Sequence, residues 1–160
     1  MIQKSGQTLI KTAGLLLSVS ILTACTGTRP VDIGISGGQL TPCPDSPNCV
    51  SSFEDKSDET HYIDAYLIKG DNQQQAWASL QALIEKNSSA EIIKQDDQYI
   101  YAEYTSGIMK FVDDTEFLLD KESNSVQLRS ASRLGYKDFD VNRDRLEAIR
   151  TELQSQNIVE

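Results

Sequence analysis

The pattern of hydrophobic and polar positions first becomes regular in the middle of the chain. Residues 61–69 mix aromatic and β-branched side chains, which predicts a strand. Residues 71–87 then carry apolar side chains at helical spacing, and Asp71 and Gln74 have the spacing of a capping box. We therefore expect a strand followed by a helix that buries Trp77.

After residue 90 the pattern changes from helical to alternating, which is typical of half-buried strands. Four strands are expected, at residues 91–95, 98–105, 108–120 (interrupted by Asp113–Asp114) and 126–133. A last helix is expected at residues 141–156, where Leu146, Ile149 and Leu153 form one stripe. Together these elements predict an α+β fold: a meandering antiparallel sheet of about five strands, two helices packed on one face, and an N-terminal disulfide loop.

The N-terminal residues predict export and lipidation. Lys4 and Lys11 precede an uncharged run at residues 12–24 that is too short to span a bilayer but suits a signal peptide. Leu22-Thr23-Ala24-Cys25 resembles the lipobox of bacterial lipoproteins, so residues 1–24 are predicted to be removed and Cys25 to carry lipid, including palmitate. An ordinary secreted protein with a cysteine there by chance is the alternative. Thr26 after the cysteine favours the outer membrane, with the domain facing the periplasm of the cell envelope.

Residues 25–40 are rich in glycine and lack periodicity, so they predict a flexible tether to a single globular domain at residues 41–160. With Cys25 lipidated, Cys43 and Cys49 remain, an even number in an exported chain. A disulfide is favoured, and a metal site using both cysteines with Asp45 or His61 is the alternative. The spacing lacks the short Cys-x-x-Cys pair of zinc sites, so we expect no metal and no cofactor.

Charge narrows the choice of partners. The formal net charge of −9 becomes −11 when Lys4 and Lys11 are removed with the signal peptide. Nucleic acid is therefore not expected as a partner. Against this acidic background, five of the six arginines fall within residues 129–150. Arginine is suited to planar contacts with carboxylate or phosphate, so the cluster predicts either an anion site or an internal ion-pair scaffold.

Alternation along the last strand places Arg129 and Arg133 on one face. Asp113 and Asp114 are the expected partners in the neighbouring strand, where only one of two adjacent carboxylates can face the arginines unless a bulge intervenes. Asn142 lies on the apolar stripe of the last helix and is expected to cap that helix or tie the preceding loop. The candidate ligand-binding residues are Arg129, Arg133, Asn142, Arg143, Asp113 and Asp114.

Three sequence blocks carry a family resemblance. They are Pro42-Cys43-Pro44-Asp45-Ser46-Pro47-Asn48-Cys49-Val50-Ser51-Ser52, then Phe111-Val112-Asp113-Asp114 with Glu116-Phe117, then Arg129-Ser130-Ala131-Ser132-Arg133 with Gly135, Asp138, Asn142-Arg143 and Arg145. In order and spacing they resemble the bacterial domain-of-unknown-function family 1499. Phe139-Asp140 departs from the pattern, which has a small or apolar residue there. The resemblance supplies no activity, but it implies that the three blocks form one constellation.

Two functions remain open at this stage. The first is a non-catalytic envelope lipoprotein that binds a small anion or a protein partner through the arginine-rich site and contacts the membrane through its lipid. The second is a hydrolase that uses Asp113 or Asp114 with Arg129 or Arg133. The chain has one histidine, no Gly-x-Ser-x-Gly elbow and no phosphate loop. The non-catalytic hypothesis is therefore favoured.

Overall fold

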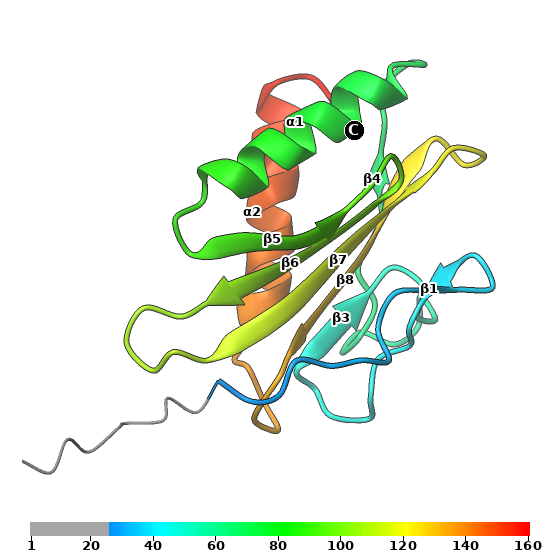
Figure 1. Ribbon diagram of the computed structural model, residues 1–160. Coiled ribbons are helices and arrows are strands. Elements are labelled where there is room, and N and C mark those ends of the chain that lie inside the picture. Colours follow the sequence, from blue (N-terminus) through cyan, green and yellow to red (C-terminus); the bar gives the residue numbers. More distant parts are fainter. Residues whose placement is uncertain (1–25) are drawn as a thin grey trace, which may run out of the picture.

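The structure is a computed structural model that describes residues 26–160; the predicted signal peptide and Cys25 lie outside this range. The elements in chain order are β1 (Ile35–Ser36), β2 (Gln39–Leu40), β3 (Cys49–Ser51), β4 (Tyr66–Leu67), α1 (Gln73–Lys86), β5 (Ala90–Gln95), β6 (Tyr99–Thr105), β7 (Val112–Asp120), β8 (Ser125–Ser132) and α2 (Val141–Ser155). The predicted α+β class is confirmed (Figure 1).

The main sheet is antiparallel, with the strand order β3-β8-β7-β6-β5. Strands β5 to β8 form the predicted meander, and each pairs with the next along its length. Two short strands from before α1 complete the edge beyond β8. β3 pairs with the C-terminal half of β8, through Cys49 opposite Ala131, and β4 pairs with its start, through Tyr66 opposite Val126. The first cysteine block and the arginine block are thereby brought together in one sheet.

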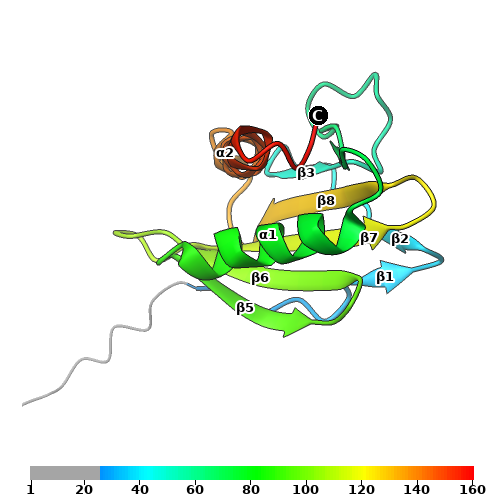
Figure 2. The same cartoon turned by 90° about the horizontal axis from the view of Figure 1, so that it is seen from above.

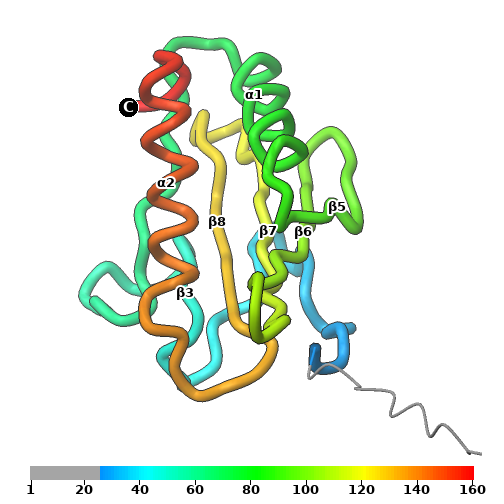
Figure 3. Tube along the Cα trace, turned by 90° about the vertical axis from the view of Figure 1, so that its left-hand side faces the viewer, coloured from blue at the N-terminus to red at the C-terminus, as the bar shows by residue number. Residues whose placement is uncertain are grey.

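Both helices cover the same face of the sheet (Figures 2 and 3). The main core lies between them and the strands and contains Leu80, Phe117, Leu128 and Leu146, all fully buried. Trp77 belongs to this core, as predicted, and its indole N–H donates to the backbone oxygen of Asp96 at 3.3 Å. The helical stripes read from the sequence therefore face the sheet, and burial of these apolar surfaces is the main stabilising contribution.

The opposite face is covered in part by the N-terminal segment. Strands β1 and β2 form a small hairpin, and Leu40 at its end is buried against Tyr99, Tyr101 and Leu118. Upstream, Arg29 forms an ion pair with Glu103 of β6. Residues 26–40 were expected to form a tether without regular structure. Instead, part of this segment packs on the sheet, because alternation in β6 gives that face aromatic rings as well as a carboxylate.

Three local predictions need correction. Asp113–Asp114 do not interrupt a strand: β7 runs through them in regular register, because arginines and hydroxyls satisfy both carboxylates. The bulge lies instead in β5, between Ile92 and Lys94. The strand expected at residues 61–69 is reduced to β4, whose two residues pair with the first residues of β8.

The start of each helix also has its own geometry. The N-cap of α1 is Asn72 without a side-chain cap, so the predicted capping box at Asp71 is not formed. Before α2, Phe139 and Asp140 both have positive φ angles, an uncommon conformation for side chains larger than glycine. This strained pair turns the chain into α2 and leaves Phe139 79% exposed. Neither helix within residues 26–160 combines the length and hydrophobicity needed to cross a bilayer.

Candidate functional site

The paired carboxylates of β7 point to opposite faces of the sheet. Ser132 donates to Oδ1 of Asp113 at 2.6 Å, and Arg145 of α2 pairs with its other oxygen. On the other face, Arg133 reaches Asp114 through Nε at 3.1 Å. The prediction that only one of the two aspartates meets the strand arginines is confirmed. The constellation is therefore split into two networks separated by the sheet.

The network on the face away from the helices, which we call the open-face network, is built from three carboxylates and three arginines. Arg133 bridges two strands, since its guanidinium contacts Asp114 and also donates to Glu103 at 2.7 Å. Tyr101 donates to Asp114 at 2.6 Å. Burial alone would raise the pKa of Glu103, but hydrogen bonds from Arg29 and Arg133 outweigh it and lower that pKa to about 2. The charged groups of Arg133, Asp114 and Glu103 are therefore satisfied by one another.

The ion pair between Arg129 and Glu116 is the most deeply buried one of this network. Nη1 of Arg129 lies 3.2 Å from Oε2 of Glu116, whose side chain is fully buried. Tyr99 donates to the other oxygen of Glu116 at 2.7 Å, and burial beside that carboxylate raises the pKa of Tyr99. Nε of Arg129 is buried and has no hydrogen-bond partner within residues 26–160. Arg129 lines a cavity of about 350 Å³ under the N-terminal segment, which Asp114 and Asp32 also line. With its carboxylates so near, this cavity has no excess positive charge for an anion.

On the helix face, Asn142 is the centre of a network that combines hydroxyls with one carboxylate and one guanidinium. Its side chain is fully buried, and its amide donates to Asp138 at 2.8 Å and to Ser132 at 3.0 Å. Its carbonyl oxygen accepts from Ser130 and, at 2.7 Å, from Arg145. The prediction that Asn142 ties the preceding loop is confirmed through Asp138. One amide thus joins β8, the following loop and α2.

Arg145 connects this network to Tyr104. The guanidinium lies 4.6 Å from the centroid of the Tyr104 ring, a cation–π contact, while it also pairs with Asp113. Burial raises the pKa of Tyr104 to about 12, so its hydroxyl keeps its proton at neutral pH. Within residues 26–160 that hydroxyl is buried without a hydrogen-bond partner. Burying a hydroxyl without a hydrogen-bond partner costs about 1–3 kcal/mol of stability, so the surroundings of Tyr104 are a candidate place for a bound ligand.

Tyr104 lines a groove of about 560 Å³ between the two helices and the end of β6. Leu83 on α1 and Ala148 and Ile149 on α2 give it aliphatic walls in part. Arg145 and Asp113 line it next to Tyr104, and the remaining lining residues are Asn87, Ser89, Thr105, Ser106, Val141, Asp144 and Glu152. The volume is in the range of small-molecule sites.

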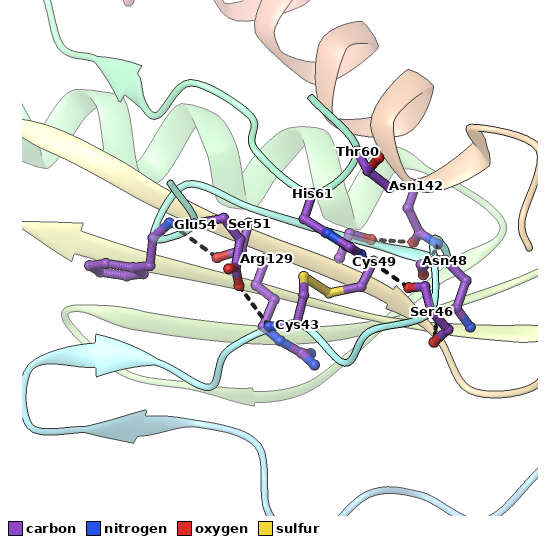
Figure 4. The surroundings of a disulfide bond; sticks show 12 residues. Cys43, Ser46, Asn48, Cys49, Ser51, Glu54, Thr60, His61, Arg129 and Asn142 are labelled. Atoms are coloured by element: carbon purple, nitrogen blue, oxygen red, sulfur yellow. Dashed lines mark hydrogen bonds between the residues drawn. A yellow bond between two sulfur atoms is a disulfide. The ribbon is translucent and has the colours of Figure 1, made fainter. Parts of the chain in front are cut away.

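The disulfide loop supports the helix-face network from the side (Figure 4). Cys43 and Cys49 are bonded, as predicted, with their Cα atoms 5.6 Å apart. Inside the ring, Asn48 donates to the backbone oxygens of Ser132 at 3.2 Å and of Gly135 at 2.6 Å. In the described part of the chain no three His, Cys, Asp or Glu side chains are grouped to hold a metal. The loop therefore fixes the end of β8 and the turn after it.

The groups expected for hydrolysis are not arranged around one reacting centre. His61 lies on the disulfide loop, with Nδ1 2.8 Å from Asp58 and Nε2 3.3 Å from the backbone oxygen of Ser46. Ser130 donates to Asn142, and Ser132 donates to Asp113, which Arg145 already neutralises. No histidine therefore contacts either serine.

The six candidate residues thus fall into three places. Arg129, Arg133 and Asp114 lie in the open-face network, and Asp113 and Asn142 lie on the helix face. Arg143 joins neither group: it donates to the backbone oxygens of Tyr62, Glu59 and Thr60. The list of candidate residues omits Glu116 and Arg145, which the family blocks include, and sequence reasoning missed Tyr104 and Glu103. The alternation of β6 could have placed Glu103 with Tyr101 on one face, but nothing in the pattern marks Tyr104 as unpaired.

The sequence matches a known family over most of the residues that form these networks. Residues 39–153 match the model of the family described as "Protein of unknown function (DUF1499)". The chain belongs to this family. Neither the curated proteins nor the solved structures include a match. The matched DUF1499 region spans the disulfide loop, the whole main sheet and α2 up to Leu153. It therefore contains the groove, the helix-face network and all of the open-face network except Arg29.

Proposed function

We propose that this DUF1499 protein is an envelope lipoprotein, anchored in the outer membrane through Cys25. Its domain would be a non-catalytic module that binds a small amphipathic molecule in the groove between α1 and α2. The observation that carries the proposal is the buried hydroxyl of Tyr104, which has no partner in the described chain and belongs to a residue that lines the groove. A ligand oxygen within reach of this hydroxyl would satisfy it.

The lining of the groove suggests the class of ligand. Leu83, Ala148 and Ile149 offer aliphatic contact, which favours an acyl or alkyl chain. Asp144 and Glu152 line the same groove, and Arg145 is neutralised by Asp113. A free anion is therefore disfavoured, and a neutral polar group such as an ester, amide or alcohol fits the Tyr104 hydroxyl. Most ligand sites combine apolar walls with a few polar groups in this way.

The arginine-rich block then has a structural role. Arg129 and Arg133 are paired with Glu116, Asp114 and Glu103, and Arg145 positions the Tyr104 ring. Removing one member of a buried ion pair leaves an uncompensated charge, so such pairs fix the relative positions of strands and helix. We propose that these arginines form a scaffold around the groove rather than an anion pocket.

A fluorescence assay tests the groove. The probe is N-phenyl-1-naphthylamine, an uncharged apolar dye that brightens in apolar surroundings. Saturable binding is expected for the wild-type protein. Ala148→Trp, an exposed change within the groove, should weaken binding at least tenfold. Ala82→Trp places the same ring at an exposed position on α1 outside the groove and should leave binding unchanged.

Competition with dodecanol tests the hydroxyl. Tyr104→Phe removes the unpaired group and should weaken competition by dodecanol by up to about tenfold, the worth of one hydrogen bond, while the probe itself binds as before. Equal binding by the two tryptophan variants, or no saturable binding at all, would refute the groove as a ligand site.

A further inference from the structure

The exposed hydrophobic side chains of the domain are concentrated at one end. Of the ten exposed large hydrophobic residues within residues 26–160, seven lie in two loops. The β6–β7 loop carries Ile108, Met109 and Phe111, and the loop from β8 to α2, up to the first residue of α2, carries Leu134, Tyr136, Phe139 and Val141. Ile108 is 93% exposed and Phe139 is 79% exposed. A soluble domain rarely groups apolar side chains in this way without a partner.

The two loops belong to one surface, which we call the apolar tip (residues 106–111 and 134–141). β7 begins after the first loop and β8 ends before the second, and the two strands pair there through Asp113 and Ser132. Arg133 donates its backbone N–H to the oxygen of Val112 at 3.0 Å. Both loops lie at the lower end of the molecule in Figures 1 and 3.

The described chain begins at this same tip. The backbone of Gly27 lies so close to the second loop that an added Cβ would be 2.9 Å from Cδ of Arg133 and 3.0 Å from Cγ of Leu134. Cys25 is only two residues upstream, within about 7 Å of extended backbone. A lipid on Cys25 would therefore leave the domain beside Leu134 and bring the bilayer to the apolar tip.

The apolar tip has no net charge, which suits a bilayer surface better than the acidic remainder of the domain. Lys110 and Lys137 balance Asp138 and Asp140 within the two loops, whereas the whole chain has a formal net charge of −9. Lys137 lies 6.0 Å from the ring centroid of Phe139, so an amine flanks an aromatic ring. Aromatic rings and lysines are frequent at the interface between lipid and water.

We infer that the apolar tip inserts into the lipid surface that holds the anchor, so that the domain sits on the bilayer in one orientation. The inference rests on the proposed lipid anchor for its choice of partner. It also has a consequence for the groove: Thr105, Ser106 and Val141, at the bases of the two loops, line the groove. The mouth of the groove would then lie close to the membrane surface, where amphipathic molecules are concentrated.

The test uses full-length protein purified with its anchor and reconstituted into phosphatidylcholine vesicles with brominated acyl chains, which quench nearby tryptophan. Ile108→Trp places a reporter on the tip. Leu67→Trp is the matched control, since Leu67 is also exposed (49%) but lies on β4, away from the tip (Figure 1). Both variants retain Trp77, which is buried, so its emission is common to the pair.

We expect brominated lipid to remove at least three times more of the added emission from Ile108→Trp than from Leu67→Trp. Equal quenching in protein whose lipid is confirmed by mass spectrometry would overturn the inference. So would a blue shift of Ile108→Trp that needs no vesicles and grows with protein concentration, because that result indicates a second copy of the chain on the tip.

Mass spectrometry separates this inference from the anchor. If Cys25 carries no lipid, the anchor proposal fails. The same quenching experiment then tests whether the apolar tip binds the vesicles without an anchor. Selective quenching of Ile108→Trp would still support the tip as a lipid-binding surface. Its absence would overturn it.

Discussion

Each face of the sheet buries one carboxylate of the Asp113–Asp114 pair, and the two faces stabilise that carboxylate with different groups. The open face surrounds Asp114 with charged groups, including Arg133 and Glu103, in a network of alternating sign. The helix face gives Asp113 one arginine and then relies on the amide of Asn142 and nearby hydroxyls. The open face therefore depends on charge balance, and the helix face depends on the direction of hydrogen bonds.

Breaking the deepest ion pair of the open face should have the largest effect. Arg129→Met leaves Glu116 buried with only the Tyr99 hydroxyl, so we expect the free energy of unfolding to fall by about 3–5 kcal/mol. Urea unfolding followed by circular dichroism measures the change. The control is Arg29→Met: Arg29 is 53% exposed, and solvent screens its pair with Glu103, so the loss of stability should be much smaller.

A double variant tests whether the unpaired charge of Glu116 causes that loss of stability. Glu116→Leu combined with Arg129→Met removes both charges and should recover most of the lost stability, since apolar groups can replace a buried pair. A double variant as unstable as Arg129→Met alone would show that shape, rather than charge balance, governs the open face.

Breaking the helix face should cost less, because its groups are mostly neutral. Asn142→Leu keeps the approximate size of the side chain but leaves Ser132, Asp138 and Ser130 without their amide partner. We expect a loss of about 1–3 kcal/mol, the cost of unsatisfied buried polar groups. The same urea titration measures it. A loss equal to that of Arg129→Met would remove the distinction drawn between the two faces.

The smallest effect is a pH dependence confined to the open face. The pKa of Glu103 is lowered in the folded protein from 4.5 to about 2, so its contribution to stability is complete above pH 4.5 and is lost as pH falls toward 2. Glu103→Gln removes this titration and should flatten the fall in stability between pH 5 and pH 2.5. A fall of unchanged steepness would assign the acid sensitivity to other carboxylates.

The contrast also shows how far the sequence could be interpreted. Periodicity predicted both helices and the meander, because alternation and helical spacing depend on which residues are apolar. The Cys43–Cys49 bond followed from the cysteine count and their closeness along the chain. Near Asp113–Asp114 the pattern failed, because two acidic residues normally mark a turn. The strand is continuous there because arginines and hydroxyls from β6, β8 and α2 satisfy both carboxylates.

The candidate site was predicted in part for a related reason. The sequence identified the arginines and the aspartates, and the faces of the strands separated Asp113 from Asp114. It could not show that Arg143 would bind the backbone oxygens of residues 59, 60 and 62, since that loop has no periodic signal. Tyr104 was invisible for another reason: whether a hydroxyl has a partner depends on the whole fold.

The pairing of β3 with β8 also bears on the order of folding. The β5–β8 meander joins neighbours along the chain and can form early, whereas Cys49 must find Ala131 across most of the domain. Contacts between distant residues carry the larger loop-closure entropy and slow a folding reaction. Oxidation of Cys43 and Cys49 needs only a short loop and can precede that step. The chain would then form its covalent ring first, and docking of this ring on a preformed meander would be the late step of folding.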